Sequence, residues 1–68
     1  MTGGNKNYGD SIAATILAAR AASEVSAKSL LVDAQNQISN YFDKLSTSEV
    51  AKLEYEIEKV ASEKGIEL

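Results

Sequence analysis

The feature that most limits this fold is a long stretch without helix-breaking residues. The chain has no proline, and no glycine lies between Asp10 and Lys44. Proline and glycine are the residues that most strongly interrupt a helix. On a helix with about 100° per residue, one apolar stripe also persists from Ile12 to Leu45. We therefore predict an all-α fold with a long, Ala-rich first helix over about residues 10–44.

A second helix is marked at both of its ends. Ser46 and Glu49 have the spacing of a capping box, in which each residue satisfies a free amide of the other. Gly65 can adopt the left-handed conformation that often ends a helix. The second helix is therefore expected over about residues 47–64.

The two predicted helices carry narrow apolar stripes. The second helix has its apolar residues at spacings of 3-4-3, at Val50, Leu53, Ile57 and Val60. The first has them at spacings of 3-4-3-4, at Leu31, Ala34, Ile38, Tyr41 and Leu45. Such stripes are typical of helices that pack on one another, and the connection is short. The pattern predicts an antiparallel hairpin in which the Tyr41 ring belongs to the core and its hydroxyl reaches water.

A second arrangement is possible because the stripe carries no large apolar residue between Arg20 and Ala27. Ser26 or Ser29 could cap a new helix beginning at Leu30. The chain would then form a compact three-helix bundle. We favour the single long helix. Two separate helices would have no reason to keep their apolar residues at the same angular position.

The predicted domain organisation is simple. Residues 1–9 hold three of the four glycines and no periodic apolar face, so we expect a flexible N-terminal arm. Residues 10–68 are expected to form a single helical domain. A domain of this size buries only about 60% of the surface that its unfolded chain exposes. Its own core supplies little stability, and self-association or a partner protein is expected.

The composition excludes most catalytic chemistry. The chain has no cysteine and no histidine, so it lacks a thiolate nucleophile, the usual zinc and haem ligands and an imidazole acid or base. Carboxylate metal sites in helical bundles normally include histidines as well. We therefore predict that the protein is not an enzyme and that it holds no cofactor or metal ion.

Charge and hydropathy argue against two further classes of partner. The formal net charge is -3 and the lysines are isolated from one another, so no basic cluster is present to contact nucleic-acid phosphates. No stretch approaches the roughly 20 consecutive apolar residues of a membrane span. A cytoplasmic or virion-associated location is the default expectation.

The N-terminal half carries a second apolar line on the back of the predicted helix. Its members are Ala14, Ala18, Ala21, Val25 and Val32. A helix that is apolar on two sides is typically buried on two sides, and small side chains let another helix approach closely. This line is the candidate interface. Tyr55 is a further candidate, because it lies opposite the apolar stripe of its own helix, where the hairpin would leave it exposed.

These patterns lead to two functional hypotheses. The first is a small, non-enzymatic structural or assembly protein that self-associates through its N-terminal helix, as phage accessory proteins or filament subunits do. The alternative is a small regulatory adaptor or inhibitor that lays one helix face against a larger protein. The alanine line would be critical under the first hypothesis, and Tyr55 under the second.

Overall fold

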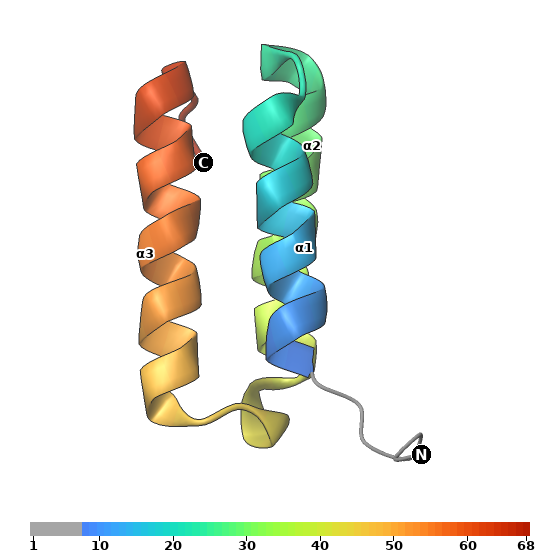
Figure 1. Ribbon diagram of the computed structural model, residues 1–68, viewed down its shortest axis with the longest axis vertical. Coiled ribbons are helices and arrows are strands. Elements are labelled where there is room, and N and C mark those ends of the chain that lie inside the picture. The colour runs from blue at the N-terminus through green and yellow to red at the C-terminus, as the bar shows by residue number, and fades with distance from the viewer. Residues whose placement is uncertain (1–7) are drawn as a thin grey trace.

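The computed structural model describes residues 8–68 and is entirely helical in its regular structure there. Its elements, in chain order, are α1 (Tyr8–Ala21), α2 (Glu24–Asn40), a short 3-10 helix η1 (Phe42–Lys44) and α3 (Thr47–Lys64). Figure 1 shows that α1 and α3 run in the same direction and that α2 runs opposite to both. The predicted all-α class is confirmed.

The core lies where the inner faces of the three helices meet. Each helix contributes an apolar stripe. The buried hydrophobic residues are Ile12, Ile16 and Ala19 from α1, Ala27, Leu31, Ala34 and Ile38 from α2, and Val50, Leu53, Ile57, Val60 and Ala61 from α3. No polar or charged side chain is buried among residues 8–68, so apolar packing alone forms this core.

The third helix begins and ends as the sequence predicts. The Ser46 side chain accepts a hydrogen bond from the Glu49 amide at 3.1 Å, and the Glu49 carboxylate accepts one from the Ser46 amide at 3.2 Å. Gly65 has a φ of 70° and ends the helix in the left-handed conformation. The Ile66 amide then donates to the Ala61 carbonyl at 2.8 Å. The local residues at each end therefore fix the length of α3.

The structure corrects the prediction of one continuous helix over residues 10–44. Helix α1 ends at Ala21, and α2 begins at Glu24 rather than at Leu30, where the three-helix alternative placed it. Ser23 is extended, with φ -66° and ψ 165°, and forms no side-chain cap. Its carbonyl accepts a hydrogen bond from the Ala27 amide at 2.7 Å. The break therefore needs neither glycine nor proline, and α2 already ends at Asn40.

Apolar burial explains why the helix breaks. When α1 folds back, Ile12 and Ile16 enter the core, where they are 0% and 4% exposed. Burying an isoleucine side chain stabilises a protein by about 1.5–3 kcal/mol. Breaking the helix removes a few backbone hydrogen bonds, each with a net value of about 0.5–1.5 kcal/mol. The burial of α1 offsets the break, whereas a projecting α1 would leave both isoleucines in water.

The turn between α1 and α2 is tied to the end of α3. The Lys64 ammonium donates a hydrogen bond to the Ala22 carbonyl at 2.8 Å. Carbonyls at the end of a helix lack partners within the helix, and a cation is favourable there. This contact joins residues 42 positions apart in the chain and closes one end of the bundle.

The opposite end of the bundle contains a pair of tyrosines. Helix α1 begins at Tyr8, two residues earlier than Asp10, and the Tyr8 ring stacks on Tyr41 with a centroid distance of 4.4 Å. Tyr41 is 37% exposed and packs against the start of α1, so its expected burial in a hairpin was wrong. Of the expected flexible arm, residues 1–7 lie outside the described residues.

Candidate functional site

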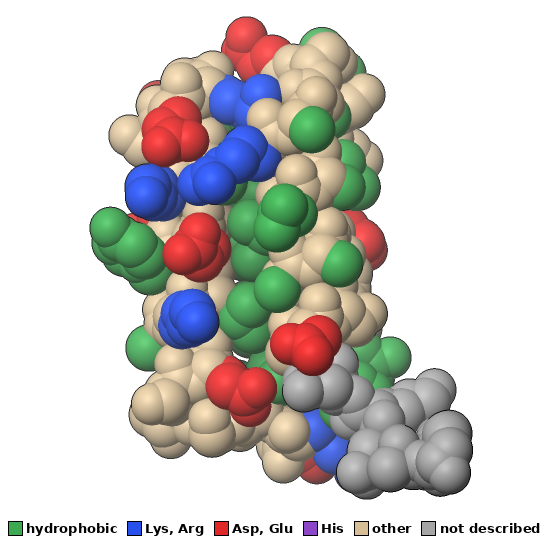
Figure 2. Space-filling view, viewed as in Figure 1, with side chains coloured by type: hydrophobic (Ala, Val, Ile, Leu, Met, Phe, Trp, Pro, Cys, Tyr) green, Lys and Arg blue, Asp and Glu red, His purple; other side chains and the backbone are tan. Residues whose placement is uncertain are grey.

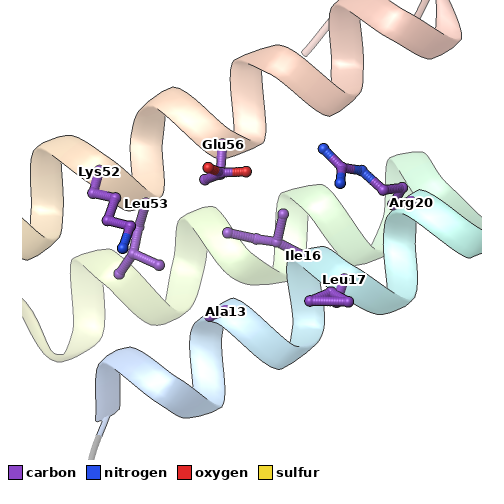
Figure 3. Close-up of a pocket in the computed structure, with 7 residues that line it drawn as sticks. All are labelled: Ala13, Ile16, Leu17, Arg20, Lys52, Leu53 and Glu56. Atoms are coloured by element: carbon purple, nitrogen blue, oxygen red, sulfur yellow. The ribbon is translucent and has the colours of Figure 1, made fainter.

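A groove runs along the surface between α1 and α3. Its volume is about 230 Å³. Figure 3 shows the seven side chains that line it: Ala13, Ile16, Leu17 and Arg20 from α1, and Lys52, Leu53 and Glu56 from α3. Ile16 and Leu53 belong to the core and form the apolar floor. Figure 2 shows hydrophobic side chains in the hollow between the two helices, with charged side chains along its edges.

The groove continues toward the start of α1. An adjoining hollow of about 120 Å³ shares Ala13, Lys52 and Leu53 with the first and is also lined by Gly9, Asp10 and Glu49. The two hollows together extend along α1 from Gly9 to Arg20. Small residues explain why they stay open, since Gly9 and Ala13 have too little side chain to fill the space between the helices.

Leu17 lies at the edge of this groove and faces solvent. Its side chain is 66% exposed, although it lines the same hollow as the core residues Ile16 and Leu53. A single exposed leucine is ordinary on a protein surface. An exposed leucine beside an open apolar groove forms a larger apolar patch, which is typical of interaction sites.

The charged residues along the groove differ between its two ends. Asp10 and Glu49 line the end near the start of α1 and α3. Arg20 lines the other end, where its Nε atom lies 4.0 Å from the Glu63 carboxylate. Both side chains are about half exposed, so this pair contributes little to stability. Asp10 and Glu49 thus lie at one end of the groove with Lys52, and Arg20 lies at the other end with Glu56.

The five residues of the predicted alanine line are all exposed, but the structure does not keep them on one helix. Ala14, Ala18 and Ala21 lie on α1. Val25 and Val32 lie on α2 and are 84% and 39% exposed. Because the chain breaks between α1 and α2, the line is divided between two antiparallel helices (Figure 1).

Val25 lies close to the end of the chain. It lines a hollow of about 450 Å³ together with Glu24 and Lys28 of α2 and with Gly65, Ile66 and Glu67, which follow α3. The surface of this hollow is therefore formed by the start of α2 and the C-terminal residues. Val25 and the α1–α3 groove thus belong to different surfaces of the bundle.

Tyr55, the remaining predicted interface residue, is 62% exposed on α3 and does not line the groove. Phe42 in η1 is similarly exposed, at 61%. Neither residue lines the two hollows between α1 and α3.

The groove was not predicted from the sequence. A pattern for it is nevertheless present: Asp10, Ala13, Leu17 and Arg20 are spaced 3-4-3 and share one side of α1. This stripe is narrow, and only Ala13 and Leu17 in its middle are apolar, so the sequence alone does not mark it as a surface. The stripe can be recognised once α3 is known to lie beside α1.

Comparison with protein-family models, with curated proteins and with solved structures finds no match to this chain. Among residues 8–68, no three acidic side chains lie together in a way that could hold a metal ion. No helix in that part of the chain is both long enough and apolar enough to cross a membrane.

Proposed function

We propose that this is a small helical assembly protein that acts by associating with copies of itself through α1. The observation that carries the proposal is the 66% exposure of Leu17 beside an apolar groove that residues 8–68 leave open. Three further apolar residues on α1, Ala14, Ala18 and Ala21, are exposed as well. Their small side chains permit close approach of a second helix.

The size of the domain supports the same proposal. A core of about a dozen side chains in a chain of 68 residues stabilises a fold only modestly. Covering Leu17 and the groove floor would remove further apolar surface from water, at about 25 cal/mol per Å². Association would therefore add stability that a lone copy lacks.

The test compares matched surface variants. Sedimentation equilibrium of the full chain is expected to show a mass that rises with concentration. The double variant Leu17→Glu with Ala21→Glu changes two exposed residues of α1 and is expected to stay monomeric. The control Val25→Glu with Val32→Glu changes two exposed residues of α2 in the same way and is expected to associate like the wild type. A wild-type chain that is monomeric at every concentration would contradict the proposal.

A second candidate function is a regulatory adaptor or inhibitor that binds a larger protein. The exposure of Tyr55 favours it, because an exposed tyrosine offers a large contact area at a low cost in conformational entropy. Under this hypothesis, Tyr55→Ala reduces binding to the larger protein and leaves the oligomeric state unchanged. Under the first proposal, Tyr55→Ala has no effect on association through α1.

A further inference from the structure

One side of α1 carries a self-complementary stripe. Asp10, Ala13, Leu17 and Arg20 all line the groove and follow one another at spacings of 3-4-3. The order along the helix is acidic, small, large and basic. Read in the opposite direction, it is basic, large, small and acidic, so each residue faces its complement when two such stripes are placed antiparallel.

This symmetry defines one register. If Leu17 of one copy packs on Ala13 of another, the residue numbers of each facing pair add up to 30, and Arg20 then faces Asp10. A two-fold axis makes every such contact twice, because residue i of one copy meets residue j of the other and the reverse also holds. We propose that two copies pack across the α1–α3 groove in this antiparallel register and form a closed dimer. The inference rests on the self-association proposed above and assigns it a surface, a register and a copy number.

The shape of the groove supports this register. Ala13 leaves the groove open above Ile16 and Leu53, at the position where Leu17 of the second copy would arrive (Figure 3). The α1 helices of both copies then lie between the two α3 helices. The α1 and α3 helices of both copies would then pack around the two-fold axis as a four-helix bundle.

The charges of α3 beside the stripe bear on this register as well. Arg20 of the second copy would reach the hollow that Asp10 and Glu49 line, where the two carboxylates outnumber the single ammonium of Lys52. Among residues 8–68, Arg20 pairs with Glu63 at 4.0 Å, which is a long contact, so a second carboxylate is a favourable addition. A parallel arrangement would instead place Arg20 beside Arg20 and Asp10 beside Asp10, which is unfavourable.

The decisive experiment uses two single charge reversals in the full chain, Arg20→Glu and Asp10→Lys. Each variant alone places like charges opposite one another at both ends of the interface, and each is expected to dimerise at least about tenfold more weakly than the wild type at low salt. An equimolar mixture restores opposite charges at both ends, so a mixed dimer is expected to form. Native mass spectrometry distinguishes the mixed dimer from the two homodimers by mass.

The matched control reverses charges outside the groove. Lys28→Glu on α2 and Asp43→Lys in η1 are both exposed, and these variants are expected to dimerise like the wild type, alone or mixed. Leu17→Glu is expected to abolish the dimer, and circular dichroism checks that it stays helical, since this residue contributes little to the core.

The outcomes separate the inference from the proposal on which it rests. A wild-type chain that never associates contradicts both. A chain that associates while either groove reversal dimerises as well as the wild type overturns only the groove dimer. The same conclusion follows if the mixture fails to regain the dimer or if species larger than a dimer dominate.

Discussion

Ile12→Ala tests whether α1 folds back onto the rest of the chain. Ile12 is 0% exposed in the bundle and is one of its largest fully buried side chains. If α1 instead continued into α2 as one long helix, Ile12 would lie on an arm that projects beyond α3. Ile12→Ala therefore lowers the free energy of unfolding much more in the bundle than in the long-helix arrangement.

The expected loss of stability is large for a chain of this size. Replacing a buried isoleucine by alanine costs about 2–5 kcal/mol, because apolar burial is lost and a cavity remains. The higher helix propensity of alanine returns only a few tenths of a kcal/mol. A domain of this length has a free energy of unfolding of roughly 3–10 kcal/mol. The variant should therefore lose a large part of its stability, and its thermal unfolding midpoint should fall by at least about 8 °C.

Urea and thermal unfolding followed by circular dichroism measure this loss. Protein concentration must be low and equal for all samples, because association adds to the measured stability. Val25→Ala is the control, since it shortens an aliphatic side chain that is 84% exposed and should change stability by no more than about 0.5 kcal/mol. If Ile12→Ala costs no more than Val25→Ala, α1 is not part of the folded core and the bundle is refuted.

Three further predictions concern the ends of the helices, and urea unfolding checks each of them. Lys64→Met removes the hydrogen bond to the Ala22 carbonyl and should cost about 1–2 kcal/mol; no loss would show that this contact does not hold the turn. Ser46→Ala removes the capping box and should cost about 1 kcal/mol, whereas Ser48→Ala, inside the first turn of α3, should cost nothing. Gly65→Ala should cost about 1 kcal/mol through its φ of 70° alone, since no atom crowds the added methyl group; an unchanged stability would contradict the left-handed cap.

The third helix could be predicted because its limits are local. The capping box at Ser46 and the glycine at position 65 act within a few residues of the positions they define. The apolar stripe of α3 has a spacing that one helix alone explains. No knowledge of the rest of the fold is needed to find either end.

The break between α1 and α2 could not be predicted in the same way, because no residue there forbids a helix. On a common helical wheel, the buried residues of α1 and those of α2 differ in mean direction by roughly 60°. That offset is small enough to look like one broad stripe. Whether the chain forms one helix or two depends on whether Ile12 and Ile16 can be buried against the other helices, and this is a property of the tertiary packing.

The groove escaped prediction for a related reason. Leu17 and Ala13 belong to it only because α3 lies beside α1. The residues that meet there are far apart in the sequence, as Ala13 and Leu53 are. The alanine line was predicted as one face on the assumption of a continuous helix. Once the helix breaks, Val25 and Val32 lie on α2, and the surface of α1 has to be considered alone.

If two copies associate through α1, the distance between equivalent residues of the two copies reveals the arrangement. The chain has no cysteine, so single spin labels at Ala14→Cys and at Ala21→Cys can be introduced in separate samples. With the two-fold axis near residue 15, the labelled residues of the two copies lie about 3 Å apart along the helix axis for position 14 and about 18 Å apart for position 21. Pulsed electron paramagnetic resonance should therefore give a short intermolecular distance for the first label and a clearly longer one for the second. Equal distances would contradict the antiparallel dimer, and the absence of any intermolecular coupling would contradict association through α1 itself.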